Sequence, residues 1–480
     1  MSDPGRLERW RSGWHAPAGP SEIWRVAAPL IVATASLSLM QFTDRMFLAW
    51  HDANSLRAVV PAGILAFTMT CGFLALVGYG QTFVAHHHGA GDPYGCARSA
   101  AQAVLLALLS WPAVLAVAPL GRAIIRASGH APDVAALERE YFDLVMLGSL
   151  GPLLTQAFGG FFSGRGHTRA TMWAHLGGNL LNIALNYCWI FGRAGFPALG
   201  LRGAALATVT AGFAPAFGLG LRFFAPSVRR RFDTLGAFRP DLRLLGRLLR
   251  FGLPAAGHMW LDLTSFAFFV FLAGRFGPAE QAAGNIALTV NALAFLPTIG
   301  IGHAASIVVG QYQGRNDPAR AERAGWTALA MAAGYMGTVG LTYVLFPTAY
   351  VSLFTDRGPG SVPHGEVFPI ARRLLVVLAL WSTGDATDLA LAGALKGAGD
   401  TRFVMTFSLA MAYGLFVGGE LLIVGVFGGG VYAAWAWTCV YIAAMAFGYL
   451  HRFRRGRWKR IDLLGRVAAA TAPDTLQVAL

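Results

Sequence analysis

The chain has 480 residues, of which 55% are hydrophobic and 13% charged, and its mean hydropathy is +0.52. Soluble domains carry about a quarter charged residues, so this composition excludes an ordinary soluble protein and indicates a polytopic membrane protein. The net charge of +14 would favour a nucleic-acid ligand in a soluble chain. Because the arginines cluster in a few segments next to apolar stretches, we expect no nucleic-acid partner.

Apolar stretches of about 20 residues, long enough to cross the hydrocarbon core as a helix, recur along the whole chain. We therefore predict an all-α fold with twelve transmembrane helices. The expected ranges are 23–50, 58–85, 97–119, 139–163, 170–192, 201–224, 250–275, 282–310, 321–347, 368–395, 402–427 and 430–450. The N-terminal segment before the first span lacks the pattern of a cleaved signal peptide, so we expect that span to be retained.

Arginines cluster in "RRRFDTLGAFRPDLRLLGRLLR" (229–250) and "HRFRRGRWKR" (451–460), whereas the alternate loops carry little excess charge. By the positive-inside rule, both termini and the 225–249 connection should be cytoplasmic. Arginines at helical spacing alternate with leucines in this connection, which predicts a short amphipathic helix that lies on anionic lipid of the inner leaflet. These arginines are Arg239, Arg243, Arg247 and Arg250.

The sequence repeats itself in three short pairs, in the same order and at nearly constant offset. "VAHHHGAGDP" (84–93) pairs with "VGQYQGRNDP" (309–318), "FSGRGHTR" (162–169) with "LKGAGDTR" (395–402), and "GLRGAALAT" (200–208) with "GVYAAWAWT" (430–438). Two pseudo-symmetric six-helix lobes of parallel topology follow, with a substrate cavity expected between them. The expected division is a tail at 1–22, an N-lobe at 23–224, a basic linker at 225–249, a C-lobe at 250–451 and a tail at 452–480.

Polar side chains inside the spans of the N-lobe are costly and therefore candidate functional residues. Counting about 1.5 Å per residue along each helix places Asp44, Asn182, Asn186 and Thr208 at one level in the outer half of the membrane. A carboxylate with amide and hydroxyl oxygens suits Na⁺ or a proton. The alternative is that Asp44 is solvated at the outer headgroup level beside Arg45.

The C-lobe carries its own intramembrane acids. Asp262 follows His258 by one helical turn near the expected midplane, and Asp385 and Asp388 share a helix face, so these acids predict a second cation or substrate site. The alternative is that they are buried against Arg372, Arg373 or the backbone. Glu420 lies close to a predicted helix end, and we expect it at the interface with the headgroups.

Other motifs carry less information. The histidines of "HHHGAG" (86–91) should point in different directions on a helix, so we expect no metal site there. The four cysteines have no paired spacing and are expected to be free thiols. Neither a Walker motif nor an HExxH or Ser/His arrangement occurs, so we expect no ATP coupling, no cofactor and no enzymatic activity.

Seven motifs in order, on twelve predicted spans, resemble the multidrug and toxic compound extrusion (MATE) family, in particular its NorM-like branch, over most of residues 23–451. They are "FVAHHHGAGDP", "FSGRGHTR", "NLLNIALNY", "PALGLRGAALAT", "FGLPAA", "IVVGQYQGRND" and "LAGALKGAGDTR". The resemblance implies a multi-pass antiporter of the bacterial inner membrane that expels amphipathic, mostly cationic compounds while Na⁺ or H⁺ enters. We expect a monomer.

The resemblance also assigns roles to individual residues. It implies that Asp44, Asn182, Asn186 and Thr208 form the cation site of the N-lobe, and that Pro29 allows the first helix to bend. It implies that Asp262 and Asp385 are the second-lobe acids, which Asp388 and Trp381 accompany. The sequence departs from the family in Asp262, where glutamate is usual, in Trp381, where tyrosine is usual, and in Arg45 directly after the first acid.

Two other functions remain open on the sequence. A lipid-linked oligosaccharide flippase of a related superfamily would export a large anionic substrate, but such proteins have about fourteen spans and a cationic cavity, whereas the charges inside the spans here are mainly acids. An exporter of one dedicated metabolite would share every feature above.

Overall fold

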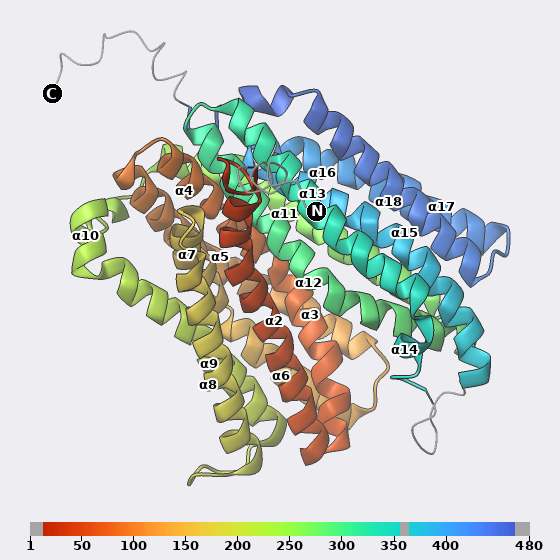
Figure 1. The fold of residues 1–480 in the computed structure, drawn as a ribbon. Helices are drawn as coiled ribbons and strands as arrows, with labels where there is room; N and C mark the ends of the chain where they lie inside the picture. The colour runs from red at the N-terminus through yellow and green to blue at the C-terminus, as the bar shows by residue number, and fades with distance from the viewer. Residues whose placement is uncertain (1–12, 356–363, 466–480) are drawn as a thin grey trace, which may run out of the picture.

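The computed structural model describes residues 13–355 and 364–465, and regular structure in these ranges is almost entirely helical (Figure 1). The N-lobe contains α2 (Pro20–His51), α3 (Ala53–Gly78), α4 (Gly80–Gly89), α5 (Pro93–Ala127), α6 (Pro132–Gly148), α7 (Leu150–Gly164), α8 (Thr168–Phe191) and α9 (Gly200–Phe224). The connection between the lobes contains α10 (Pro226–Phe232) and the short η1 (Gly236–Phe238).

The C-lobe contains α11 (Leu242–Ala273), α12 (Pro278–Gly314), α13 (Pro318–Leu345), α14 (Pro347–Val351), α15 (His364–Gly397) and α18 (Val431–Arg454), followed by η4 (Arg457–Arg460). Between α15 and α18 lies one long helix whose C-terminal two thirds are wound mostly as π-helix. Its parts are α16 (Thr401–Leu409), the π segment η2 (Ala410–Val417), α17 (Gly418–Glu420) and the π segment η3 (Leu421–Val426).

In the described ranges, eleven helical stretches are long and apolar enough to cross a membrane, α3 with α4 and α6 with α7 each forming one of them. The helix α8 is less apolar, because Asn179, Asn182 and Asn186 lie on one of its faces, but its 24 residues pack between α2 and α9. With α8 there are six spans in each lobe. The predicted all-α fold with twelve spans is confirmed.

Equivalent residues of the two lobes meet each other where the lobes touch. Gly89 of α4 abuts Gln311 of α12, and Gly314 of α12 abuts His86 of α4; a Cβ atom at either glycine would overlap the facing carbonyl oxygen. The two glycines hold the same place in the first pair of repeated motifs, and so do His86 and Gln311. The two lobes are therefore closely packed here, and the contact is nearly symmetric.

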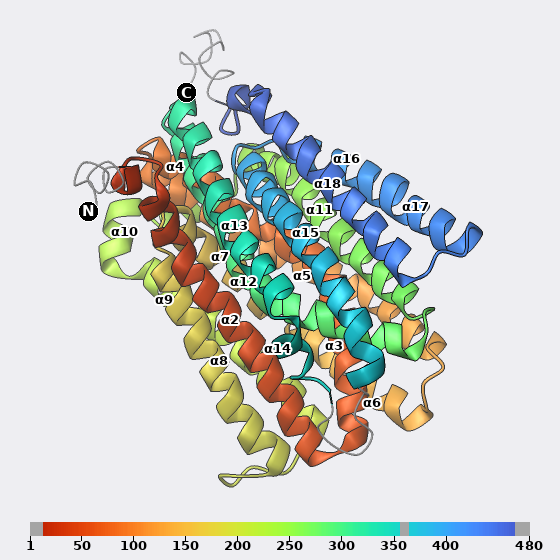
Figure 2. The same ribbon diagram turned by 45° about the vertical axis from the view of Figure 1, so that its right-hand side comes forward.

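The side chains at this contact repeat the symmetry. His86 Nε2 lies 2.8 Å from the carbonyl oxygen of Gly397, and Gln311 Nε2 donates to the carbonyl oxygen of Gly164 at 2.8 Å. Gly164 and Gly397 hold the same place in the second pair of repeated motifs. We call the end of the molecule that carries this contact, α10 and the described chain ends the linker side, and the opposite end the distal side (Figures 1 and 2).

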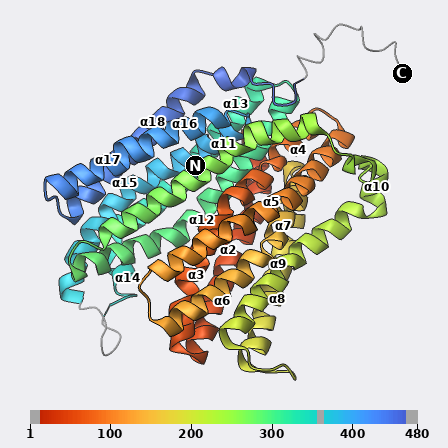
Figure 3. The same cartoon turned by 180° about the vertical axis from the view of Figure 1, so that it is seen from behind.

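The first helix, α2, belongs to both lobes. Near its start Ile23 and Ala27 pack into the core of the C-lobe, whereas Phe47 and Leu48 near its end pack into the core of the N-lobe. Pro29 lies buried within the continuous helix, near the end of the part that packs on the C-lobe, since Leu30 and Ile31 after it still contact that core. From the linker side, the helices of the two lobes run apart toward the distal side (Figures 1 and 3).

The predicted amphipathic helix of the linker is wrong in its boundary. The helix begins at Leu242 and continues without a break into the seventh span as α11, with the Asp241 side chain accepting from the first backbone amides. Leu244 and Leu248 are buried against Tyr79 and other apolar side chains of the linker side. Much of the apolar face therefore contacts protein and not lipid, although the Leu242 side chain is exposed.

Candidate cation and substrate sites

The four polar residues predicted for the N-lobe lie in one hydrogen-bonded chain. Asn186 Nδ2 of α8 donates to Asp44 Oδ1 of α2 at 2.5 Å and to Asn182 Oδ1 at 2.8 Å. Asn182 Nδ2 in turn donates to Thr208 Oγ1 of α9 at 3.5 Å. The polar faces of α2, α8 and α9 therefore meet at one level. The count of residues along the predicted helices placed these side chains at one level as well.

This chain of bonds is buried and has spare acceptors. Asn182 and Asn186 are fully buried and Asp44 is 9% exposed. An amide nitrogen has two hydrogens, and both hydrogens of Asn186 Nδ2 are used, whereas the buried Asn186 Oδ1 has no hydrogen-bond partner in the described ranges. A carboxylate with an unsatisfied amide oxygen beside it can take up a proton or a small cation.

Two neighbours of this site were not predicted from the sequence. Tyr141 of α6 is buried beside Asp44, and its hydroxyl contacts the Thr208 side chain. Asn179, further along the same face of α8, donates to Ser36 Oγ of α2 at 2.7 Å. Asn179 could have been predicted from the sequence, because it precedes Asn182 and Asn186 at helical spacing. Tyr141 lies at the start of a predicted span, and no feature of the sequence indicated that it would lie at this site.

Arg45 follows Asp44 directly and interacts with it electrostatically, but the two side chains differ in exposure. Its side chain is exposed whereas Asp44 is buried, and the ion pairs of the described ranges do not include one between them. Adjacent residues of a helix point about 100° apart, which explains the difference. The alternative in which Asp44 is a solvated headgroup-level acid does not agree with its burial.

The acids predicted for the C-lobe lie near one another on α11 and α15. Asp262 Oδ2 lies 3.1 Å from His258 Nδ1, with 47% of the Asp262 side chain exposed. Trp381 Nε1 donates to Asp385 Oδ2 at 2.5 Å, and Asp388 interacts electrostatically with both other acids. One oxygen of Asp388 is buried without a hydrogen-bond partner among the described residues.

A cation of the C-lobe that the sequence reasoning missed lies close to these acids. Lys396, near the end of α15, interacts electrostatically with Asp262 and Asp388. It was overlooked because the predicted span ended just before it. The arginines named as alternative partners are not involved: in the described ranges no ion pair joins Arg372 or Arg373 to these acids, and Arg373 lies over the Tyr432 ring at 5.4 Å.

Glu420, expected near a helix end at the interface with the headgroups, is enclosed by the protein and not exposed on its surface. Its side chain is fully buried in the C-lobe, where Thr438 Oγ1 of α18 lies 3.2 Å from Glu420 Oε1. The helix ends at Val426, close to the predicted end, and α18 packs beside Glu420 through Thr438.

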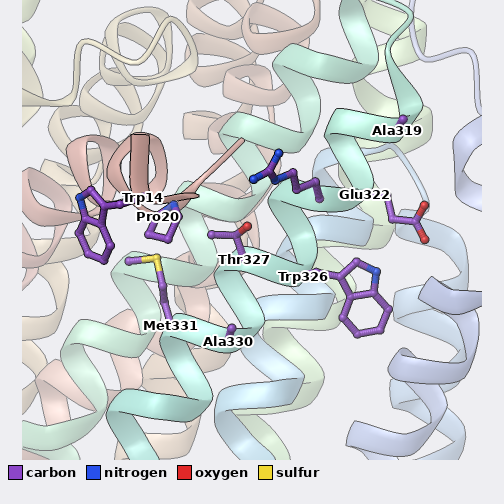
Figure 4. A pocket seen from close by; sticks show the side chains of 9 residues that line it. Trp14, Pro20, Ala319, Glu322, Trp326, Thr327, Ala330 and Met331 are labelled. Carbon is purple, nitrogen blue, oxygen red and sulfur yellow. The ribbon is translucent and has the colours of Figure 1, made fainter. Parts of the chain in front are cut away.

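The three consecutive histidines lie at the linker side, where two of them have separate partners. His86 contacts Gly397 in the other lobe, and His87 Nδ1 lies 2.9 Å from Asp92 Oδ2. A hollow of about 630 Å³ lies on the same side, between the start of α2 and α13 (Figure 4). It is lined by Trp14, Pro20, Ala319, Glu322, Arg323, Trp326, Thr327, Ala330 and Met331, and so contains none of the predicted site residues.

The MatE family model matches the chain twice, over residues 29–188 and again over 254–417. The chain belongs to the MATE family of multidrug efflux transporters. Each match covers most of one lobe, which agrees with the repeat seen in the sequence and with the near-symmetric contact between the lobes.

Curated relatives and solved structures agree with this MATE assignment. A probable multidrug resistance protein NorM of Pseudomonas putida is 30% identical over 453 residues, which cover 93% of this chain and 96% of the relative. The multidrug resistance protein NorM of Burkholderia vietnamiensis is 31% identical, over 81% of this chain and 83% of its own length.

Two solved structures have the same fold. The outward-facing conformation of a multidrug resistance MATE family transporter superimposes with a TM-score of 0.81 at 20% identity, covering 92% of this chain and 96% of the other. A MOP superfamily transporter from Pyrococcus furiosus gives a TM-score of 0.82 at 20% identity, covering 94% and 98% of the two chains. At this identity the comparison concerns the fold alone.

Proposed function

We propose that this MATE protein is a secondary active antiporter that expels amphipathic, cationic small molecules while Na⁺ or H⁺ enters the cell. The observation that carries the proposal is the buried chain of hydrogen bonds from Asp44 through Asn186 and Asn182. A carboxylate buried in a membrane span is costly unless it binds a partner. A cation bound at Asp44 would offset that cost, and its binding would couple cation entry to export. The proposed cycle uses no cofactor.

The transport cycle proposed here is alternating access. The start of α2, through Ile31, packs on the C-lobe, and the part with Asp44 packs on α8 of the N-lobe. A cation bound at Asp44 favours one packing of the distal part of α2 in the N-lobe. Because α2 also packs on the C-lobe, this packing changes the contact between the lobes. Pro29 is the place where the helix can bend. Such coupling requires that the cation bind the two conformations with different affinity.

The acids of the C-lobe are proposed to bind the substrate or a second cation. Asp262 is half exposed, and it lies near Asp385 and Asp388, with Lys396 as a neighbouring cation. Three acids against one lysine favour a cationic ligand. A flippase for a large anionic lipid-linked oligosaccharide would need the opposite charge, whereas an exporter of one dedicated cationic metabolite would use the same chemistry.

We further propose that the protein spans the bacterial cytoplasmic membrane as a monomer, with the linker side and both termini in the cytoplasm. Arginines of α10 and of the end of α18 lie on the linker side, in agreement with the positive-inside rule. In this orientation Arg243 and Arg250, both at the linker-side end of α11, face the headgroups of the inner leaflet and attract anionic lipid.

Ethidium efflux in proteoliposomes, measured under separate Na⁺ and pH gradients, tests this function. We expect one of the two gradients, directed into the cell, to drive ethidium outward without ATP. Ethidium movement that follows neither gradient would contradict the antiport, and movement of an anionic lipid-linked sugar would favour the flippase instead.

A further inference from the structure

The buried carboxyl group of Glu420 lies between two π segments, in a part of the C-lobe that the proposed mechanism does not use. It is fully buried, and its Oε2 atom has no hydrogen-bond partner in the described ranges. Among the described residues, the side chain bonded to it is that of Thr438, through Oγ1 to Oε1 at 3.2 Å. π-Helical turns inside α-helices are frequent at functional sites.

The internal repeat relates this pair to the N-lobe site. Thr208 and Thr438 are the last residues of the third pair of repeated motifs. Counted from the threonines that begin α8 and α16, Asn186 corresponds to Gly419, the residue directly before Glu420. A π turn holds more residues than an α turn because its bonds run from i to i+5. The π segment η2 therefore shifts the count by one residue, and Glu420 occupies the position that Gly419 would hold in a regular α-helix.

The position of Asp44 has a different residue in the C-lobe. Pro29 and Pro254 lie within the first helix of each lobe, and the same count along the chain from these prolines leads to Asp44 and to Phe269. Phe269 is buried, with its ring centroid 5.7 Å from that of Trp435. The N-lobe thus has its carboxyl group on the first helix and an amide on the fifth, whereas the C-lobe has an aromatic ring on the first helix and a carboxyl group on the fifth.

The hydrogens available at Thr438 fit a protonated Glu420. The Thr438 hydroxyl has a single hydrogen, yet its oxygen lies 3.0 Å from the Ala434 carbonyl oxygen as well as 3.2 Å from Glu420 Oε1. If Glu420 is protonated, its O–H donates to Thr438 Oγ1, and the Thr438 hydrogen goes to Ala434. If Glu420 is ionised, both acceptors compete for one hydrogen and a buried charge keeps at most one bond.

The residues around Glu420 do not supply a counter-charge. Among the described residues, the side chain that acts electrostatically on Glu420 is that of Thr438, and no charged or titratable group does so. The nearest titratable side chain along α18 is Cys439, which is bonded to the Val377 carbonyl oxygen of α15. The ion pairs of the described ranges include none to Glu420. An isolated carboxylate inside a membrane protein is costly, so the neutral acid is favoured.

We propose that Glu420 is a proton-binding site of the C-lobe, which is held as a neutral acid by its hydrogen bond to Thr438 and releases its proton to water when the lobes rearrange. By the internal repeat, Glu420 and Thr438 occupy the region of the C-lobe that the Asp44 site occupies in the N-lobe. The role in the transport cycle rests on the proposed antiport, but protonation of the carboxyl group does not.

Infrared spectroscopy of the purified full-length protein tests the protonation directly. We compare the wild type with Glu420→Gln, which keeps the shape and a donor toward Thr438, and with Glu366→Gln as control, because Glu366 is exposed in the first turn of α15. At neutral pH, the spectrum of the wild type minus that of Glu420→Gln should contain the C=O band of a protonated carboxyl group. The same difference for Glu366→Gln should contain only an ionised carboxylate; an ionised carboxylate for Glu420 as well would overturn the proposal.

Two further variants separate the parts of the proposal. Thr438→Val should move the Glu420 band to the frequency of a carboxyl group without a hydrogen bond, whereas Thr438→Ser should leave it unchanged; an unmoved band in Thr438→Val would contradict the assigned partner. In proteoliposomes, Glu420→Gln should lose part of the pH-driven efflux that Glu366→Gln retains. Full pH-driven efflux in Glu420→Gln would overturn its coupling role, whereas a wild type that follows no gradient would contradict the antiport itself.

Discussion

Gly89 of the N-lobe lies directly against the backbone carbonyl of Gln311 in the C-lobe, and its repeat counterpart Gly314 lies against His86 in the same way. No side chain fits at either position, because a Cβ atom would overlap the facing oxygen. Closure of the linker side therefore depends on two glycines that the repeat places symmetrically.

The double substitution Gly89→Ala and Gly314→Ala should shift the protein away from this conformation. Overpacking costs about 1–3 kcal/mol per site, so the population closed at the linker side should fall by about tenfold or more. The measurement is the distance distribution between spin labels on Tyr94→Cys and Ala319→Cys, both exposed on the linker side, in a cysteine-free background. We expect longer distances in the double variant.

The control for this experiment is Gly337→Ala, because a Cβ atom there would meet nothing within 4 Å. It should leave the distances unchanged. Identical distributions in the double variant and in this control would show that the glycine contacts do not determine closure.

Asn186→Ala should weaken coupling, since it removes the donor to Asp44 and to Asn182. A hydrogen bond to a charged group contributes about 1.5–3 kcal/mol, so gradient-driven efflux should fall by about tenfold or more. The matched control is Asn54→Ala, which removes an exposed amide bonded to Asp133 at 3.0 Å. Equal efflux in the two variants would remove Asn186 from the site.

Trp381→Phe should change the affinity for cationic substrates. The substitution deletes the N–H donor to Asp385 and keeps an aromatic ring against Phe269, whose centroid lies 5.7 Å away. Loss of about 1 kcal/mol predicts about a fivefold change in the dissociation constant of ethidium, measured by fluorescence, and none for a neutral dye. Trp437→Phe, which removes a donor to the Leu415 carbonyl oxygen instead, is the control; equal effects of the two would contradict a specific role of Trp381.

Arg45→Gln should leave efflux within about twofold of the wild type, because exposed charges interact weakly and the exposed Arg45 side chain makes no ion pair with Asp44 in the described ranges. The measurement is ethidium efflux under each gradient. A loss as large as that of Asn186→Ala would mean that Arg45 takes part in coupling.

The sequence alone was sufficient for the spans and for the N-lobe site, for a physical reason. Helix rise and periodicity are regular, so a count of residues places Asp44 level with Asn186 and Thr208. The same asparagines lower the hydropathy of α8, which was nevertheless predicted at 170–192 among the apolar stretches.

Departures from regular helix geometry could not be predicted. The π segments η2 and η3 change the register of the eleventh span, and Glu420, expected near a helix end at the headgroups, is fully buried beside Thr438 of α18. Likewise, the continuation of α11 through Arg247 depends on contacts with Tyr79 and Leu463, which are distant in the sequence. Tertiary contacts decided both outcomes.

Above all, Asp44 is proposed to couple cation entry to drug export. Ethidium efflux by Asp44→Asn in proteoliposomes, under separate Na⁺ and pH gradients and at matched protein amounts, tests this role most directly, because the substituted amide keeps the shape of the side chain but cannot carry its charge. We predict that the variant still binds ethidium but is driven by neither gradient. Gradient-driven efflux at the rate of the wild type would contradict the coupling role of Asp44.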